Sequence, residues 1–576
     1  MRYRLFLAGI LLILAGAFLA HKVQTSGGTS VTEARWPADK GVVMSGLLYV
    51  PAGVDATHPA PAVLISHGYI NTREMQSPFA IELSRRGFVV LAMDMTGHGQ
   101  SGGNVGADGF GGPAALAWLR KQPLVDPDNI GMEGHSLGGA PVIAAATALP
   151  DGYRSIVLEG STLGLFGQPG EGTPTFPRNL SLVFGRYDEF ASMWQQTRGS
   201  DVPHSARLQK MFGTERDVVV GKAYGDAAAG TARILHIPPV THPWEHFSQA
   251  GIGHAVDWFQ TTLSGEKSPR DPMDQIWIWK EVGTLVAFVG LIVLMLGTFQ
   301  LALSIPGLSS LKRPLEPSRA ARGSGGWIAL VLTALIPALT FFPFMKLGMV
   351  FLPQPLFPQW VHNQILVWAA LNGLITIVLG VLFRRGRPAF TNDWVRSIAI
   401  SLITVGVGYL SLALVDQVFK VDYRFWVLGL KPLDGPHWAM FATYAPIWVA
   451  YYLVALRALC GNLSVEGEGA GRAYLTAILA LAGGFGLLLS AEYGSLFATG
   501  LLLTPKEPLS TIVAIQFVPL LTVVGIISVF TWRRTNSFVP AGLICGLLIA
   551  WYITGGTATH WSAEFPLKIP GVSKAK

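Results

Sequence analysis

The sequence predicts a domain built on a mostly parallel β-sheet with helices on both faces, followed by an all-α polytopic membrane domain. Half of the 576 residues are hydrophobic and only 13% are charged, whereas soluble domains carry roughly 25% charged residues. The charged residues concentrate between residues 30 and 275, where strand-like and helix-like segments alternate as in βα units. Residues 280–556 are instead a series of long apolar runs.

The chain begins with a basic tetrapeptide, MRYR, and a short apolar run at residues 5–20. This arrangement is typical of a signal peptide or a signal anchor. The run contains one Ala-x-Ala sequence, which comes too early to leave a good apolar region before a cleavage site. We therefore expect residues 1–22 to remain as an uncleaved N-terminal anchor.

Strands and helices alternate through residues 30–270, the range we assign to an extracytoplasmic domain. Strands are expected within 41–53, 61–68, 88–103, 128–150, 153–161, 179–189, 216–226 and 232–240, and helices within 79–87, 109–123, 128–150, 190–197 and 248–263. Strands that alternate with helices in this way pair in parallel. The active site of such a sheet lies at the carboxyl ends of the strands.

One segment, GHSLGG at residues 134–139, lies where a buried strand must turn abruptly into a helix. The bare pattern Gly-x-Ser-x-Gly is frequent by chance, but small residues at a strand–turn–helix junction hold the serine exposed in a strained conformation. The context therefore predicts Ser136 as a nucleophile.

A serine nucleophile needs a base, and the base needs an acid that orients it. Asp188 follows a strand and precedes a loop, and it is the favoured acid. Glu159 also ends a strand after the nucleophile and stays an alternative.

The favoured base is His242, the first histidine in the loop PVTHPWEHF between the last strand and the last helix. His246 in the same loop is the alternative. His236 falls inside a strand-like segment and His254 on a helical face, so both are expected to be packing residues, and His204 precedes the last strand.

A tetrahedral oxyanion requires backbone N–H donors arranged around it in advance. The N–H of Leu137 lies at the start of the helix after the nucleophile, and the N–H of Tyr69 lies just past Ser-His-Gly. We expect these two groups to form the oxyanion site.

Several of these segments together resemble the α/β-hydrolase superfamily, nearest its dienelactone-hydrolase-like and prolyl-oligopeptidase-like branches. The resemblance covers residues 40–263 and is carried by SHGY (66–69), DMTGHGQSGG (94–103), GHSLGG (134–139), FGRYDE (184–189) and VTH (240–242). It implies acyl transfer to water through an acyl-enzyme on Ser136, and a structural role for Asp94, His98 and Ser101.

The sequence departs from that resemblance in two places. Only a short Gly/Pro-rich segment separates Ser161 from Asn179, so no helical cap is expected there, and the segment 189–231 or outer membrane loops would have to cover the site. No N-terminal segment could form a β-propeller, which weakens a peptidase interpretation.

Residues 276–557 are expected to form a membrane domain of about eight transmembrane helices. The apolar runs lie near 282–303, 327–345, 364–383, 397–418, 438–456, 473–491, 511–531 and 538–556. Lys and Arg are enriched in the compact loops that a cytoplasmic N-terminus would place inside. This bias predicts nine spans in all, with the hydrolase domain and a tail at 558–576 outside the cytoplasm.

The predicted function is a membrane-anchored serine esterase that cleaves apolar acyl esters at the outer membrane face. A serine peptidase with the same residues, or a transporter or sensor with a regulatory hydrolase domain, stays open. The expected partner is the lipid bilayer, with homo-oligomers possible. No cofactor or metal is expected, and no nucleic-acid partner, since the loop bias accounts for much of the net charge of +7.

Overall fold

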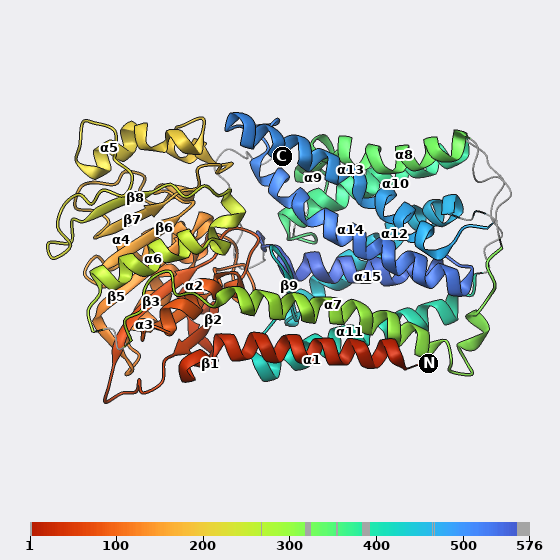
Figure 1. Cartoon of the computed structure of the whole chain (residues 1–576), viewed down its shortest axis with the longest axis horizontal. Helices are drawn as coiled ribbons and strands as arrows, with labels where there is room; N and C mark the ends of the chain where they lie inside the picture. The colour runs from red at the N-terminus through yellow and green to blue at the C-terminus, as the bar shows by residue number, and fades with distance from the viewer. Residues whose placement is uncertain are drawn as a thin grey trace. The chain divides into compact units, whose positions relative to one another are not determined.

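The computed structural model describes residues 3–265, 268–316, 324–352, 355–382, 392–463, 465 and 467–561. The chain divides into two compact units, both drawn in Figure 1. The helical unit comprises Met1–Phe18, Gly283–Gly494 and Lys506–Gly555. The sheet unit comprises Leu19–Val282, Ser495–Pro505 and the chain from Gly556 onward. Each unit has a buried apolar interior of its own.

An eight-stranded sheet with the order β1-β2-β4-β3-β5-β6-β7-β8 forms the centre of the sheet unit. β1 pairs antiparallel with β2 and β2 antiparallel with β4, while the other neighbours are parallel. The strands are β1 (Ser30–Pro37), β2 (Val43–Val50), β3 (Ala60–Ser66), β4 (Val89–Met93), β5 (Val125–His135), β6 (Ser155–Glu159), β7 (Leu180–Val183) and β8 (Arg233–His236). The predicted mostly parallel sheet is confirmed, with an edge strand, β1, that was not predicted.

Helices cover both faces of this sheet. α2 (Ser77–Ser84) packs with α6 (Gln249–Thr262), and α3 (Gly112–Arg120) packs with α4 (Gly139–Ala148) (Figure 1). Every residue of β3 and β4 is buried. A strand covered on both sides reads as a continuous apolar run, which is why these segments carry no polar alternation.

Two predictions for the segment after β7 are wrong. The expected helix at 190–197 is only a 3-10 turn, Ala191–Trp194, and residues 216–226 form no strand apart from an isolated bridge at Tyr224. Val219 and Val220 are about half exposed, and Gly221 has a positive φ of 74°. The β-branched residues therefore have no sheet surface to pack on, and the glycine turns the chain away.

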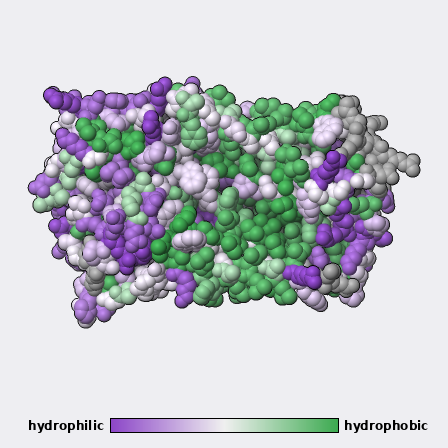
Figure 2. Space-filling view, in the orientation of Figure 1, coloured by the Kyte–Doolittle hydropathy of each residue, from purple (hydrophilic) through white to green (hydrophobic). Residues whose placement is uncertain are grey.

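The helical unit has the helices of a multi-pass membrane protein. Its long helices are α1 (Arg4–Gln24), α7 (Trp277–Ala302), α10 (Trp360–Leu382), α11 (Trp394–Phe419), α12 (Gly435–Leu463), α13 (Ala470–Thr499), α14 (Pro508–Thr535) and α15 (Val539–Gly556). By length and composition, these eight helices of the described chain could each cross a membrane. Figure 2 shows hydrophobic side chains over most of the visible surface of these helices, whereas hydrophilic side chains predominate on the sheet unit.

The predicted span at 327–345 is broken. α8 (Ser324–Leu339) and α9 (Phe341–Phe351) are bent by 51° at Thr340, and they count as a ninth span only if the pair is taken together. Pro343 is the third residue of α9. Its nitrogen cannot donate to the carbonyl of Leu339, and its ring would clash with that carbonyl if the helix continued straight.

The C-terminal segment does not behave as a separate tail where it is described. Ala558 is 1% exposed and belongs to the apolar core of the sheet unit. Most of the predicted tail, residues 562–576, lies outside the described residues.

Candidate active site

Ser136 lies at the junction between β5 and α4, at the carboxyl end of a central strand. Its φ is +54°, a strained left-handed conformation for a residue with a Cβ. Glycines flank it because the turn is packed against backbone. A Cβ at Gly134 would collide with the Gly138 carbonyl, and a Cβ at Gly138 would lie 2.7 Å from the His67 carbonyl oxygen. The strand–turn–helix junction predicted for GHSLGG is therefore present.

The structure brings Ser136, His242 and Asp188 into one hydrogen-bonded chain. The Ser136 Oγ lies 2.8 Å from His242 Nε2, and His242 Nδ1 lies 2.8 Å from Asp188 Oδ2. His242 begins the 3-10 turn after β8, and Asp188 lies in the turn after β7. Asp188 is 2% exposed and His242 5% exposed, so bulk water competes little for these bonds.

Further hydrogen bonds hold the acid and the histidine in place. The Phe190 N–H donates to Asp188 Oδ1 at 2.6 Å, and the His242 N–H donates to Glu189 Oε2 at 2.8 Å. Burial alone would lower the pKa of His242, but the carboxylates of Asp188 and Glu189 favour the imidazolium. The net effect is a pKa above the ordinary histidine value.

The alternative site residues lie elsewhere. His246 Nδ1 pairs with Gln76 Oε1 at 2.8 Å. Neither carboxylate oxygen of Glu159 has a hydrogen-bond partner among the described residues. His236 in β8 stacks on His254 in α6 at a ring distance of 3.7 Å, and both are packing residues as expected.

The two predicted oxyanion donors belong to segments that adjoin Ser136. Leu137 follows it in the chain, and Tyr69 lies in the turn after β3. A Cβ at Gly68, the residue before Tyr69, would be 3.1 Å from the Ser136 Cβ, so this turn lies directly against the nucleophile. Ile70 has a φ of +54°, which is a strained conformation for a β-branched residue.

The three other residues that the resemblance assigned to a structural role have one. Asp94 accepts the backbone N–H of Arg73 at 2.8 Å and that of Gln100 at 3.1 Å. Ser101 bridges two strands, since its hydroxyl donates to the Asp94 carbonyl and accepts the N–H of Ser45. His98 pairs with the Thr96 carbonyl. These bonds fix the loop after β4.

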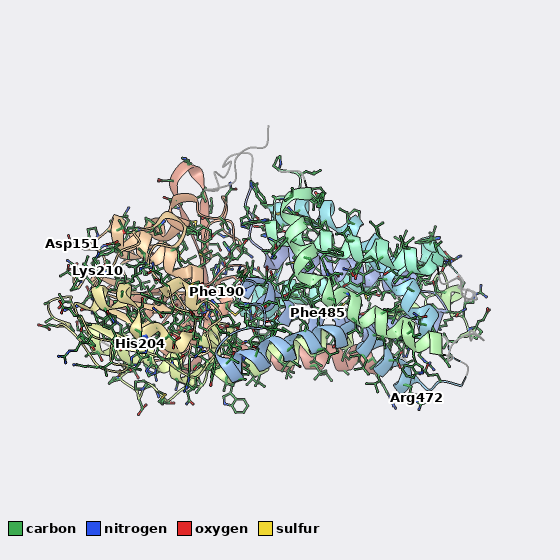
Figure 3. All side chains as sticks on the ribbon, turned by 90° about the horizontal axis from the view of Figure 1, so that it is seen from above. Asp151, Phe190, His204, Lys210, Arg472 and Phe485 are labelled. Carbon is green, nitrogen blue, oxygen red and sulfur yellow. The ribbon has the colours of Figure 1, made fainter. Side chains whose placement is uncertain are left out.

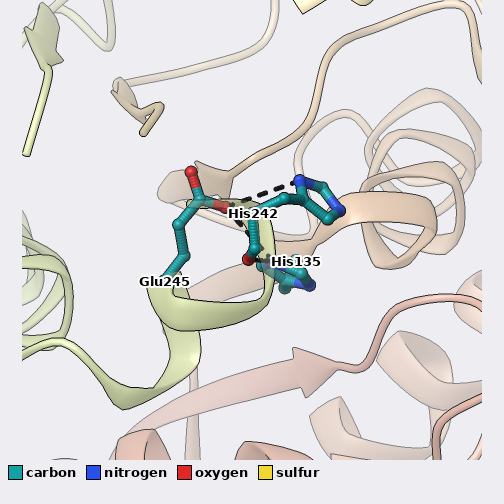
Figure 4. Close-up of side chains that lie close together, drawn as sticks. All are labelled: His135, His242 and Glu245. Carbon is teal, nitrogen blue, oxygen red and sulfur yellow. Dashed lines mark hydrogen bonds and ion pairs between the residues drawn. The ribbon is translucent and has the colours of Figure 1, made fainter. Parts of the chain in front are cut away.

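A second buried group of polar side chains lies beside His242 and was not predicted. Glu245 Oε2 lies 3.2 Å from His135 Nε2 and 3.9 Å from His242 Nδ1 (Figure 4). Glu245 Oε1 accepts the Gly185 N–H at 2.6 Å. Burial and the neighbouring acids raise the pKa of Glu245 well above its usual range, and burial lowers the pKa of His135. Burial therefore disfavours the charged form of both side chains.

His135, His242 and Glu245 have atoms close enough together to hold a metal ion. The His242 ring already makes hydrogen bonds through both nitrogens, one to Ser136 and one to Asp188. A metal on His242 would therefore break one of the two bonds that link it to the nucleophile and the acid.

Sequence comparison links part of this domain to peptidases and to hydrolases. The model for X-Pro dipeptidyl-peptidases of the S15 family matches residues 40–181. An uncharacterized protein of Mycobacterium tuberculosis is 36% identical over 92 residues, which are 16% of this chain and 33% of that protein. A thiohydrolase of Aspergillus aculeatus is 32% identical over 116 residues, 18% of this chain and 34% of that protein. The chain thus spans about a third of the length of these curated relatives.

Two solved structures each match about two fifths of this chain. A dienelactone hydrolase from Anabaena variabilis covers 41% of this chain and 99% of its own, with a TM-score of 0.28 and 18% identity. An esterase from Butyrivibrio proteoclasticus with bound ferulic acid covers 40% and 99%, with a TM-score of 0.29 and 20% identity. The chain carries a hydrolase domain of the α/β type, joined to a part made of long apolar helices. This conclusion rests on the strand order, the strand–turn–helix junction at Ser136 and the family match.

Proposed function

We propose that this protein is a serine hydrolase that cleaves carboxylic esters through an acyl-enzyme on Ser136. The observation that carries the proposal is the hydrogen-bonded chain from Ser136 through His242 to Asp188, with 2.8 Å at both links. This chain supplies an activated nucleophile, a base and a group that orients the base.

In the first half of the reaction, His242 Nε2 takes the proton of the Ser136 hydroxyl as Oγ attacks the ester carbonyl. Asp188 holds the tautomer with the proton on Nδ1 and stabilises the imidazolium. The imidazolium then gives its proton to the leaving alcohol as the ester bond breaks. The acyl group stays on Ser136.

In the second half, water replaces the alcohol. His242 takes a proton from the water, whose oxygen attacks the acyl carbon, and the proton returns to Oγ as the acid is released. The backbone N–H groups of Leu137 and Tyr69 would stabilise the oxyanion in both halves. Leu137 directly follows Ser136 in the chain, and the turn that contains Tyr69 packs against Ser136 at Gly68, which supports this role.

Apolar side chains beside the reacting groups favour an apolar acyl chain. Phe190 packs against His242 with the rings 4.7 Å apart. Phe190 is partly buried, whereas Asp151 and Lys210 are exposed (Figure 3). The segment between β6 and β7 contains one 3-10 turn and no cap helix. One of the relatives is a thiohydrolase of Aspergillus aculeatus, and a thioester would react here by the same steps.

We further propose that the hydrolase domain acts at the outer face of a membrane, with the N-terminus in the cytoplasm. The uneven distribution of Lys and Arg among the loops supports this orientation. Single cysteines introduced into the sheet unit would test it, because the two native cysteines, Cys460 and Cys545, are buried. A membrane-impermeant maleimide should label them in intact cells, and labelling only after lysis would overturn the orientation.

Labelling with a fluorophosphonate probe tests the nucleophile. The purified full-length protein should be labelled once and lose ester hydrolysis, while Ser136→Ala should take no label and have no activity. Ser101→Ala is a matched control, since Ser101 is a buried hydroxyl with a structural role. Equal labelling of wild type and Ser136→Ala would reject the assignment. Full cellular function of Ser136→Ala would instead favour a transporter or sensor role.

A second candidate function is cleavage of peptides, because the S15 peptidase model matches residues 40–181. Both activities would use the same three residues, so mutation of the site does not separate them. A panel of p-nitrophenyl acyl esters compared with Xaa-Pro p-nitroanilides does. A higher kcat/KM for the anilides, lost in Ser136→Ala, would favour the peptidase.

A further inference from the structure

The chain that follows the last apolar helix returns to the sheet unit and pairs with it. The Thr559 N–H donates to the Gly97 carbonyl at 2.7 Å, and the Val105 N–H donates to the Thr559 carbonyl at 2.9 Å. Ala558 lies in the apolar core. The segment Thr557–His560, which we call the return segment, thus has the packing of a structural element.

The return segment ends at a buried contact with Tyr69. His560 Nε2 lies 2.7 Å from the Tyr69 hydroxyl, and the two rings meet edge to face with their centres 5.6 Å apart. His560 is 3% exposed. Burial and the neighbouring His98 lower the pKa of His560 to about 3, and burial raises the pKa of Tyr69. Both groups are therefore neutral, and the Tyr69 hydroxyl and His560 Nε2 share one hydrogen bond.

Tyr69 belongs to a turn that needs to be held. The residue after it, Ile70, has a φ of +54°, and the residue before it, Gly68, packs on Ser136. A strained turn persists only when its surroundings fix it. The hydrogen bond to His560 fixes the side chain of the residue whose N–H would face the oxyanion.

We propose that His560 is a positioning residue for the oxyanion turn, so that the return segment completes the active site of the hydrolase domain. The inference rests on the proposed function, because it assigns the Tyr69 N–H to the oxyanion. His560 itself does not touch the substrate. It connects the chain directly after α15 to the turn beside the nucleophile.

The first test compares His560→Ala with His560→Gln in the full-length protein. A small misplacement of a catalytic group costs up to about 100-fold in rate, so we expect His560→Ala to lower kcat roughly 10- to 100-fold with little change in KM. Gln carries an oxygen at a position similar to Nε2 and should restore part of the loss. An unchanged kcat, or a loss confined to KM, would overturn the proposal.

A readout specific to the oxyanion separates positioning from general damage. An aryl boronic acid forms a tetrahedral adduct on Ser136 and should lose affinity in His560→Ala in proportion to kcat/KM. Titration of active serines with a fluorophosphonate corrects both values for any misfolded fraction. Boronate affinity equal to that of the wild type, with reduced kcat, would contradict the proposal.

A double-mutant cycle with Tyr69→Phe tests the contact itself. If His560 acts through the Tyr69 hydroxyl, His560→Ala should lower kcat little further in a protein that already carries Tyr69→Phe. If the two substitutions lower kcat independently, so that their effects on the activation free energy add fully, His560 does not act through the Tyr69 hydroxyl.

Two truncations test the return segment as a whole. A chain that ends after Trp561 keeps the segment and should retain activity, whereas a chain that ends after Gly556 should lose it. Equal activity of the two would overturn the proposal. Failure of the proposed function looks different, since Ser136→Ala would then keep its esterase activity.

Discussion

Glu245 and His135 form a buried pair beside the candidate active site, with 3.2 Å between Oε2 and Nε2. Glu245 is fully buried and His135 is 2% exposed. Burial raises the pKa of Glu245 and lowers that of His135, so the charged form of each side chain is disfavoured. Asp188 is then the residue whose carboxylate accepts the hydrogen bond from His242 Nδ1, at 2.8 Å.

Glu245→Gln should therefore keep most of the activity at pH 7. The amide preserves the acceptor for the Gly185 N–H and differs little in shape from a protonated carboxyl. Glu245→Ala leaves that N–H buried without its acceptor, which costs about 1–3 kcal/mol of unfolding free energy. Steady-state kinetics and thermal unfolding of both variants test this. A loss in Glu245→Gln as large as in Asp188→Asn would mean that Glu245 acts as a charged group.

Asp188→Asn should abolish most of the activity. An amide cannot hold the required tautomer of His242, and the equivalent change in a serine protease lowers kcat about 10⁴-fold. Ester hydrolysis by the purified variant, corrected by active-site titration, gives the value. Asp151→Asn serves as a control because Asp151 is exposed and pairs with Arg178 at the surface.

The pH profile of the same variant gives a second readout. His242 must be neutral to accept the Ser136 proton, so kcat/KM falls as pH drops through its pKa. In the wild type, the midpoint of this fall should lie at a pH above the ordinary pKa of histidine, because Asp188 and Glu189 raise the pKa of His242. In Asp188→Asn the carboxylate that raises the pKa of His242 is gone, whereas burial still lowers that pKa. The fall in kcat/KM should therefore occur at a lower pH in this variant than in the wild type. A fall at the same pH in both proteins would contradict the assignment of His242.

Glu159→Gln should stabilise the protein, and more so at higher pH. Burial raises the pKa of Glu159 well above its usual range. Between the unfolded and folded pKa values the folded state keeps a proton that the unfolded state releases, so stability falls as pH rises. Glutamine does not titrate and therefore removes this pH dependence. In the wild type, the free energy of unfolding falls by up to about 1.4 kcal/mol for each pH unit above the pKa that Glu159 has in the unfolded chain. Thermal unfolding at pH 5 and pH 8 measures the difference.

Glu82→Gln is the matched control for that experiment. Glu82 is also fully buried, but it pairs with Arg86 at 3.0 Å and Arg85 at 2.7 Å. Removing one partner of a buried ion pair costs about 3–5 kcal/mol. The two glutamine variants should therefore shift the unfolding temperature in opposite directions. Destabilisation of Glu159→Gln at pH 8 would show that its carboxylate is ionised and paired.

The sequence predicted those parts of the site that local signals mark. Ser136 lies in a strand–turn–helix junction, and Asp188 and His242 each follow a strand in the expected chain order. Their meeting depends only on the parallel sheet, which brings the carboxyl ends of β5, β7 and β8 to one edge. The three residues could therefore be predicted to lie together without knowledge of the order of the strands in the sheet.

The parts that were missed depend on contacts between residues far apart in the chain. Tyr69 and His560 are separated by 491 positions, and nothing near His560 in the sequence points to a strained turn. Glu245 lies in the predicted loop between the last strand and the last helix, but its contacts with His135 and Gly185 join residues 60 or more positions apart in the chain. The false strand at 216–226 shows the opposite error, since β-branched residues there indicate strand propensity without a neighbouring strand.

The packing of α1 on α7 predicts that the N-terminal helix is retained in the mature protein. A Cβ at Gly16 would lie 2.5 Å from the Ala287 nitrogen, and one at Gly290 would lie 2.7 Å from the Ile13 nitrogen. Such close backbone approach is typical of packed membrane helices. Gly290→Leu should therefore lower the unfolding temperature in detergent, whereas Gly406→Leu should not, because nothing lies within 4 Å of a Cβ at Gly406. If residues 1–22 were removed by a signal peptidase, Gly290→Leu would be as silent as Gly406→Leu, and N-terminal sequencing of the purified protein would begin after residue 22.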